Sequence, residues 1–265
     1  MPGEYALPNS DEAAAARFAA FESLFDPSTF RHLDALEVGP GWRCWEVGAG
    51  GTSVVRWLAE RVGPDGRVLA TDIDVTRVSG ADGGAVEVRR HDVGTDPAPA
   101  ETFDLVHARL VLVHVPRRDE ALAAMVASLR PGGWLLLEDA DPALQPLSCI
   151  DPAGTEEEAV LAERIRTGFR TVLNAGGADL AFGRTLPRRL RASGLTEVRA
   201  DASFPVDDPA CAALEAATVQ LLRGRLVADG IAADEELDRH LAAVAEGRLA
   251  LAQPPMIAAW GRKPD

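Results

Sequence analysis

Residues that could bind a ligand gather around position 50 of this chain. The apolar run 44–47 is typical of a strand, Gly48, Ala49 and Gly50 follow it, and a helical pattern begins near Ser53. Glycine allows a tight turn and a close approach of the backbone to a ligand. The start of the following helix offers unpaired N–H groups and the positive end of the helix dipole. The stretch therefore predicts a binding loop between a strand and a helix.

An acidic residue ends the next apolar run. Asp72 closes the segment 67–72, and an acid at the tip of a second strand can bind the two ribose hydroxyls of a nucleoside. The dinucleotide pattern G-x-G-x-x-G is incomplete, because Ser53 occupies its last place. Glu46, just before the glycines, would repel a pyrophosphate but suits a cofactor that carries an amino group. These residues favour an adenosine cofactor without phosphate, although for the loop alone a plain turn between two elements stays an alternative.

Three further segments continue the pattern. Residues 86–93 form a third run that contains Asp92, residues 103–108 form a fourth, and residues 129–138 combine a helix end, a Pro-Gly-Gly turn and a fifth strand. The five segments, in this order, resemble the class I S-adenosylmethionine-dependent methyltransferases, and in particular the bacterial enzymes that methylate small natural products. The resemblance covers residues 41–141 well and the C-terminal part loosely.

Strands and helices alternate through the first half of the chain, which predicts a parallel sheet with right-handed crossovers. Together with the resemblance, this indicates an α/β fold: a Rossmann-like, seven-stranded, mostly parallel sheet with helices on both faces and an antiparallel last strand at 256–261. We interpret residues 1–265 as a single methyltransferase domain. Its expected parts are an N-terminal helical lid (1–40), a cofactor-binding core (41–141) and two helical insertions over the active site (142–182 and 207–253).

Helical spacing and capping residues predict the remaining elements. Thr155 is expected to cap a helix whose first turn holds three glutamates, which suit the positive end of the helix dipole. The expected helices are 11–25, 27–38, 155–175, 183–192, 209–228 and 234–245, and a sixth strand is expected at 197–204.

The resemblance implies cofactor contacts in the glycine loop. Glu46 would hold the methionine ammonium of S-adenosyl-L-methionine, directly or through water, and Gly48, Ala49 and Gly50 would form the turn against the cofactor. The family often has glycine where this chain has Thr52, and the replacement is expected to change only the shape of the loop.

The resemblance also implies contacts at the ends of the later strands. They would bind the ribose, pack on the adenine, accept a hydrogen bond from the adenine amino group, and flank the methionine part through the backbone. The residues in these roles are, in that order, Asp72, Ile73, Asp92 with Val93 beside it, and Ala108 with Arg109.

Methyl transfer from an activated sulfonium is an in-line displacement, so alignment of the nucleophile with the methyl carbon can supply most of the catalysis. A base assists when the acceptor is a phenol or an alcohol. The catalytic candidates are His114, Glu138, Asp139 and Asp141, with His107 as a further candidate base. For each histidine a purely structural role stays an alternative.

Acceptor contacts are expected from three residues. Tyr5, the single tyrosine of the chain, would fold over the cofactor or the acceptor, with a disordered chain end as the alternative. His114 and Asp141 are the other two. Asp139 and Asp141 could hold a divalent ion, but nothing in the sequence completes such a site, so no metal is expected.

Composition limits the partners. The chain has 27 basic and 41 acidic residues and a net charge of −14, which argues against a nucleic-acid substrate. No apolar run approaches the roughly 20 residues that span a bilayer, and the N-terminus lacks a signal pattern. The 3 cysteines are widely spaced, as in reduced proteins. We expect a cytoplasmic protein with a small-molecule substrate, no nucleic-acid or membrane partner, and a homodimer as one option.

The expected activity is transfer of a methyl group from S-adenosyl-L-methionine to an oxygen, nitrogen or carbon atom of a small, partly hydrophobic acceptor. S-adenosyl-L-homocysteine would be the spent cofactor, and secondary-metabolite or antibiotic biosynthesis the setting. Two alternatives stay open: a cofactor-binding cyclase of the same fold that transfers no methyl group, and a binding protein with a decayed site. A short-chain dehydrogenase is excluded, because no tyrosine follows the fourth strand.

Overall fold

The computed structural model describes residues 12–147 and 153–265. The chain divides into two compact units. The helical unit holds the described residues up to Phe25 together with residues 141–180 and 204–255. The sheet unit holds residues 26–140, 181–203 and 256–265.

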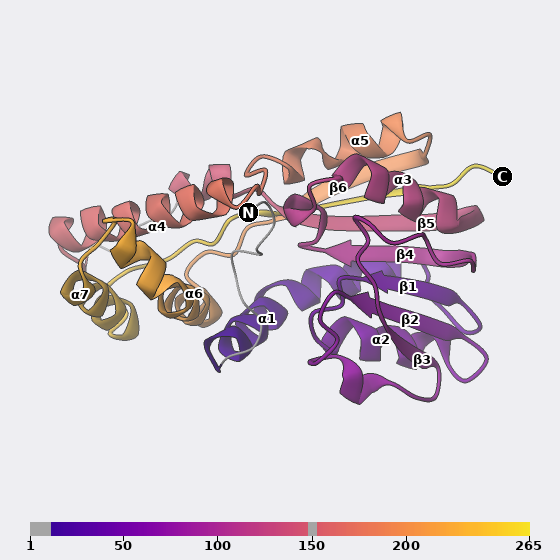
Figure 1. The fold of residues 1–265 in the computed structure, drawn as a ribbon, viewed down its shortest axis with the longest axis horizontal. Helices are drawn as coiled ribbons and strands as arrows, with labels where there is room; N and C mark the ends of the chain where they lie inside the picture. Colours follow the sequence, from indigo (N-terminus) through magenta and orange to yellow (C-terminus); the bar gives the residue numbers. More distant parts are fainter. Residues whose placement is uncertain (1–11, 148–152) are drawn as a thin grey trace. The chain divides into compact units, whose positions relative to one another are not determined.

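Seven strands of the described chain form one sheet, and all of them belong to the sheet unit. They are β1 (Arg43–Val47), β2 (Arg67–Asp72), β3 (Val86–Arg90), β4 (Phe103–Arg109), β5 (Leu129–Ala140), β6 (Thr196–Ser203) and β7 (Met256–Arg262). Their order is β3-β2-β1-β4-β5-β7-β6 (Figure 1). Strands β1 to β5 pair in parallel, whereas β7 is antiparallel to both of its neighbours. The expected Rossmann-like fold with an antiparallel last strand is confirmed.

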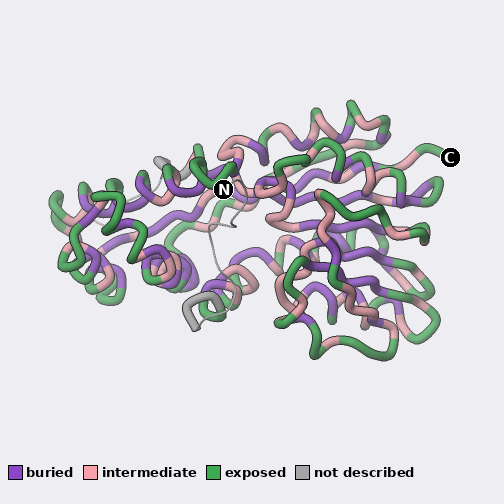
Figure 2. The backbone as a smooth tube through the Cα atoms, viewed as in Figure 1, coloured by how far each residue is buried: buried purple, intermediate pink, exposed green. Residues whose placement is uncertain are grey.

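Three helices of the sheet unit pack directly on strands. Helix α2 packs against β1 and β2, α3 against β4 and β5, and α5 against β6 and β7. The central strands are buried along most of their length (Figure 2). These helices are α2 (Ser53–Val62), α3 (Arg118–Ser128) and α5 (Leu186–Ala192), with short turns η1 (Ser79–Ala81), η2 (Leu112–His114) and η4 (Gly183–Thr185).

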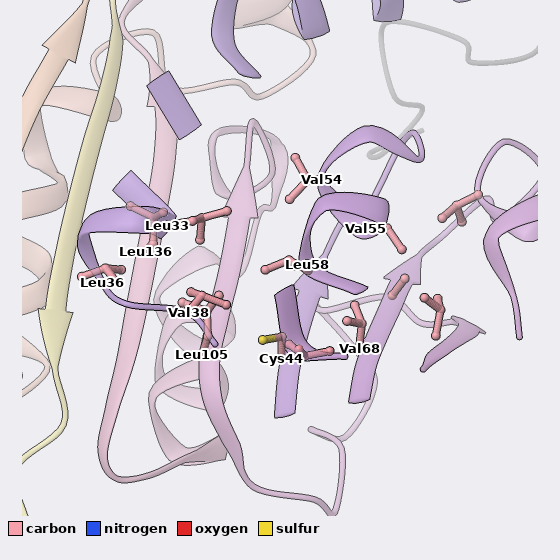
Figure 3. Close-up of a cluster of buried hydrophobic side chains, with 14 of the residues drawn as sticks. Leu33, Leu36, Val38, Cys44, Val54, Val55, Leu58, Val68, Leu105 and Leu136 are labelled. Carbon is pink, nitrogen blue, oxygen red and sulfur yellow. The ribbon is translucent and has the colours of Figure 1, made fainter. Parts of the chain in front are cut away.

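An apolar cluster fills one face of the sheet (Figure 3). Val54, Val55 and Leu58 of α2 recur at helical spacing and are buried against β1 and β2. Leu33 of helix α1 (Glu12–Ala35) and Leu36, which follows its last residue, belong to the same cluster. The C-terminal half of α1 therefore covers this face together with α2.

The prediction of two separate helices at 11–25 and 27–38 is wrong, because one continuous helix, α1, runs through Pro27. Proline removes one backbone hydrogen bond from a helix. The buried positions Phe25, Thr29, Leu33 and Leu36 nevertheless keep helical spacing on both sides of the proline. Burial of this continuous stripe offsets the lost hydrogen bond, which the local sequence alone could not indicate.

The helical unit contains three long helices that pack against one another. They are α4 (Glu156–Ala175), α6 (Pro209–Ala228) and α7 (Asp234–Ala245), and the unit also holds the short turn η3 (Pro142–Leu147). Their bounds agree with the expected helices. Thr155 caps α4 as predicted: its hydroxyl accepts from the Glu158 N–H at 3.1 Å, and its own N–H donates to the Glu158 carboxylate at 2.9 Å.

A buried ion cluster joins these three helices. The Arg166 guanidinium of α4 donates to the Glu215 carboxylate of α6 at 3.1 Å, and Nε2 of His240 on α7 lies 3.0 Å from the same carboxylate. Burial alone would raise the pKa of Glu215, but the Arg166 charge and the His240 contact lower it to about 2. A charge buried in this way needs its partners, so the cluster ties the three helices together.

Replacing Leu58 with alanine tests the core of the sheet unit. Leu58 is fully buried between α2 and the sheet, so Leu58→Ala should lower the free energy of unfolding by about 2–5 kcal/mol. Urea denaturation measures this change. Glu60→Ala, at an exposed position of the same helix, should change it by no more than about 0.5 kcal/mol. Equal effects of the two substitutions would contradict this packing.

Candidate functional site

The loop after β1 is held by contacts on both sides. Gly48 (φ 64°) and Gly50 (φ 55°) adopt the left-handed conformation that favours glycine. A Cβ atom on Gly48 would lie 2.3 Å from Cγ2 of Val111, which belongs to the loop after β4. On the other side, the N–H of Ala49 donates to the Thr71 carbonyl of β2 at 2.9 Å. A larger side chain at position 48 would therefore push two loops of the site apart.

Asp72 lies at the carboxyl end of β2, next to this loop. Its carboxylate accepts from the N–H of Gly50 at 3.0 Å and from the N–H of Asp74 at 2.9 Å. Burial raises the pKa of Asp72 above its ordinary value, although these two N–H groups act in the opposite direction. The next residue, Ile73, is 51% exposed. An acid and an exposed apolar side chain thus stand side by side, as ribose and adenine binding would require.

The end of β3 lies beside the end of β2. The N–H of His91 donates to the Asp72 carbonyl at 2.9 Å, and Arg90 donates to the Ile73 carbonyl at 3.1 Å. The following Asp92 is half-buried, and its carboxylate accepts from the N–H of Gly94 at 2.8 Å. This turn fixes the Asp92 carboxylate near the strand end where the sequence predicts adenine recognition.

At the carboxyl end of β4, the side chain of Arg109 is engaged by α1. Ala108 pairs with Val47 and is buried. The Arg109 guanidinium contacts α1 instead, donating to the Thr29 hydroxyl at 2.9 Å and pairing with the Asp26 carboxylate at 2.8 Å. Leu110 follows with φ 58°, and its N–H donates to the Glu138 carbonyl at 2.7 Å. A bulky residue rarely adopts this conformation, and such strain is concentrated at functional sites.

Glu46 is buried on β1 and faces a histidine. Its Oε2 accepts from Nδ1 of His107 at 2.6 Å, and the two residues are register partners on β1 and β4. Oε1 of Glu46 has no hydrogen-bond partner among the described residues. One carboxylate oxygen is therefore fixed by the protein, while the other is available to a ligand.

Glu138 on β5 lies on the other side of His107. It accepts from Nε2 of His107 at 3.3 Å, from the Thr29 hydroxyl at 2.5 Å and from Nδ1 of His32 at 3.1 Å. Burial alone would raise the pKa of Glu138, but the hydrogen bonds from the two histidines hold it far below its ordinary value. A carboxylate with this low pKa and three donors is a poor general base. The three donors hold the Glu138 carboxylate in place between β4 and α1.

The row of buried charges continues through α1 to the far edge of the sheet. Ala258 of β7 stands in register between Glu138 and Asp201 of β6. Its small side chain leaves space for His32 of α1, whose ring bridges Glu138 at 3.1 Å and Asp201 at 2.9 Å. We call Glu46, His107, Glu138, His32 and Asp201 the charge row. It links the start of the glycine loop to α1 and β6.

The remaining acidic candidates lie at the end of β5 (Asp139) and directly after it (Asp141). Asp139 is fully buried, and its carboxylate accepts backbone hydrogen bonds from Leu112 and Val113 of η2, while Oδ1 has no partner among the described residues. Burial raises the pKa of Asp139 well above its ordinary value. Asp141 is also fully buried, and its N–H donates to the Pro255 carbonyl at 2.9 Å within the helical unit. His114 is half-buried at the end of η2.

Two predicted contacts are less defined by the structure. Val93 is half-buried next to Asp92, and Tyr5 lies outside the described residues. Across residues 12–147 and 153–265 no group of three or more His, Cys, Asp or Glu side chains is placed to hold a metal ion. Within the same residues no helix is long and apolar enough to cross a membrane.

The contribution of α1 to the site is missing from the sequence analysis. Thr29, His32 and Asp26 contact Glu138 and Arg109, yet they precede the glycine loop and match none of the five segments. Their signal is polar side chains at buried positions of an amphipathic helix. Such positions require buried partners, but only the fold shows which strands supply them.

Comparison with known proteins agrees with this geometry. A family model described as a methyltransferase domain matches residues 45–137. Methyltransferase str2 of Strobilurus tenacellus is 30% identical over 232 residues, which span 82% of this chain and 77% of that protein. Nocamycin O-methyltransferase of Saccharothrix syringae is 32% identical over 206 residues, 71% of each chain.

A solved structure supports the fold. Phosphoethanolamine N-methyltransferase 2 of Haemonchus contortus, in complex with S-adenosyl-L-methionine, has a TM-score of 0.59 at 13% identity, over 97% of this chain and 58% of that one. The sheet order, the glycine loop followed by an acid at the tip of β2, and two relatives matched over most of their length lead to one family. The chain belongs to the class I S-adenosylmethionine-dependent methyltransferases.

Proposed function

We propose that this enzyme transfers a methyl group from S-adenosyl-L-methionine to an oxygen, nitrogen or carbon atom of a small, partly hydrophobic natural product. The observation that carries the cofactor placement is the hydrogen bond from the Gly50 N–H to the Asp72 carboxylate. It couples the glycine loop to the acid that would bind the ribose. The acceptor class is supported by one of the two relatives matched over most of their length, which is named for O-methylation of nocamycin.

The residues of the sheet unit fit the methyl donor. Close packing of Gly48 on Val111 fixes the backbone of the glycine loop, which would turn against the cofactor. Asp72 offers a carboxylate for two ribose hydroxyls, and the exposed Ile73 offers an apolar surface for adenine. Asp92 would accept from the adenine amino group, and Oε1 of Glu46 would accept from the methionine ammonium.

The chain needs to contribute mainly alignment. The sulfonium of the bound methyl donor supplies an activated methyl group. Glu46 would hold the methionine ammonium of the donor and Asp72 its ribose, and Val111 of the loop after β4 packs on Gly48 in the loop that lies between these two acids. Holding the acceptor atom in line with the methyl carbon then supplies most of the rate acceleration.

Proton removal from the acceptor is assigned to groups other than Glu138. We propose that Asp139 positions His114, because its carboxylate binds the backbone of the η2 turn that ends in His114. Asp141 and His114 are proposed as the acceptor-side acid–base groups. The lid role of residues 1–40, 142–182 and 207–253, the acceptor contact of Tyr5, a cytoplasmic location and a homodimer stay predictions.

Removing the Asp72 carboxylate should weaken cofactor binding. Asp72→Ala loses two hydrogen bonds to ribose hydroxyls, so the Kd for S-adenosyl-L-homocysteine should rise by at least about tenfold. Isothermal titration calorimetry measures the change, and Asp65→Ala, at an exposed loop position of the same unit, is the matched control. Wild-type affinity in Asp72→Ala would show that the nucleoside binds elsewhere.

A labelled donor tests methyl transfer directly. The enzyme is incubated with methyl-labelled S-adenosyl-L-methionine and a panel of phenols, enols, amines and electron-rich aromatic natural products. Label should enter at least one acceptor, with an equal amount of S-adenosyl-L-homocysteine. If an acceptor is consumed and its product carries no label, the cyclase alternative replaces the proposal.

Substituting Asp139, at the end of β5, and Asp141, directly after it, separates donor binding from turnover. Asp139→Asn and Asp141→Asn should lower kcat by about a hundredfold or more if proton transfer depends on them. The Kd for S-adenosyl-L-homocysteine should stay within about threefold of the wild-type value, because neither residue is proposed to contact the donor. Unchanged turnover in both variants would remove them from the mechanism.

A further inference from the structure

We infer that His107 is a positioning residue for the methyl donor: clamped between Glu46 and Glu138, it turns the free oxygen of Glu46 toward the methionine ammonium. The inference rests on the proposed function, because it requires that Glu46 accept a hydrogen bond from the methionine ammonium. His107, held in turn by the rest of the charge row, would thus take part in donor binding without contacting the donor.

The two ring nitrogens of His107 each contact one of the carboxylates. Nδ1 of His107 lies 2.6 Å from Glu46 Oε2, and Nε2 lies 3.3 Å from Glu138 Oε2. A neutral imidazole donates from one nitrogen only, so both contacts are hydrogen bonds only when the ring is an imidazolium. Both ring nitrogens then donate, and the ring cannot rotate without losing two charge-assisted bonds.

The surroundings of His107 keep the ring charged. Burial alone would lower the pKa of His107, but the Glu46 charge and the hydrogen bonds to Glu138 and Glu46 raise it to about 9. These two carboxylates, on β1 and β5, are the titratable groups that face the ring. Beyond them, Glu138 faces His32 of α1 and is stabilised by the charge of Arg109 on β4.

The clamp is anchored outside the donor site. Glu138 is itself fixed by the Thr29 hydroxyl and by His32, which also contacts Asp201 on β6. The charge row contacts Glu46 only through Oε2, by the His107 hydrogen bond, which leaves Oε1 as the oxygen for a ligand. A carboxylate held in this way loses little side-chain freedom when an ammonium binds. Glu46 is therefore pre-organised for the amino-acid part of the donor and does nothing for the nucleoside part.

Two ligands separate binding of the amino-acid part of the donor from binding of its nucleoside part. S-adenosyl-L-homocysteine carries the amino acid, whereas 5′-methylthioadenosine carries only the nucleoside and a thioether. In His107→Gln the Kd for S-adenosyl-L-homocysteine should rise by about tenfold or more, while the Kd for 5′-methylthioadenosine stays at the wild-type value. Glu46→Gln should give the same pattern. The double variant should lose little more than either single variant, since both remove the same interaction.

The matched control is His240→Gln, which breaks another buried histidine–glutamate contact in the helical unit. It should leave the ratio of the two Kd values unchanged. Thr29→Val removes a donor to Glu138 without touching His107, and it serves where His107→Gln does not fold. A smaller rise in the same ratio is expected for it.

The outcomes separate donor binding by the protein from the role of His107 in it. Failure of the wild-type protein to bind S-adenosyl-L-homocysteine would overturn the proposed function. Binding by the wild type with an unchanged ratio in His107→Gln and Thr29→Val would overturn the role of His107 alone. Equal weakening of both ligands would also overturn it, because His107 would then act through the general fold.

The pH dependence of the melting temperature tests whether the His107 ring is charged. A histidine whose folded pKa is about 9 binds a proton more tightly than in the unfolded chain, so its stabilising effect is full below about pH 6.5 and is lost as the pH rises toward 9. The melting temperature of the wild type should fall across this range, and the fall should be smaller in His107→Gln. The pKa of His32 is raised in the same direction by its hydrogen bonds to Glu138 and Asp201, against the effect of burial, so some slope should remain. Parallel pH profiles would contradict a charged His107.

Discussion

The hydrogen bond from the Gly50 N–H to the Asp72 carboxylate is the constraint on which the site depends. It joins the loop after β1 to the tip of β2, and the other contacts of the loop follow from it. Parallel strands bring their carboxyl ends to one edge, so the ends of β3 and β4 lie at that edge too. Glycine at position 48 lets Val111 close the loop from the β4 side. A short local geometry thus organises residues that are far apart in the sequence.

A second constraint acts beneath this edge, where charges are buried on one face of the sheet. Glu46, His107 and Glu138 stand on three adjacent strands, and none of them would be stable alone in a buried position. Alternation of acid and imidazolium balances the charge. The small Ala258 lets His32 extend the row to Asp201. In the proposed site, donor binding by Glu46 and the packing of the C-terminal half of α1 on the sheet therefore depend on connected hydrogen bonds.

Much of this architecture could be predicted from the sequence, for identifiable reasons. The bounds of β2, α6 and α7 agree with the prediction because each has a local signal: β2 is a short apolar run that ends at an acid, an Asp-Pro pair starts α6, and three acidic residues start α7. The loop from Gly48 to Gly50 and the acid at Asp72 were predictable because their chemistry is local. The continuity of α1 through Pro27 and the role of Thr29 and His32 were not, since both depend on partners more than a hundred residues away. The partners of Glu138 were not predictable for the same reason, because its donors come from α1 and β4.

The central claim concerns where the donor lies and which atoms hold it. A crystal structure of the protein with S-adenosyl-L-homocysteine is the most direct measurement. The account predicts the ribose hydroxyls within about 3 Å of the Asp72 carboxylate, and the amino group at a similar distance from Oε1 of Glu46, directly or through one water. His107 should remain between Glu46 and Glu138. A nucleoside bound away from Asp72, or an amino group held by other residues while Glu46 stays paired only with His107, would contradict it.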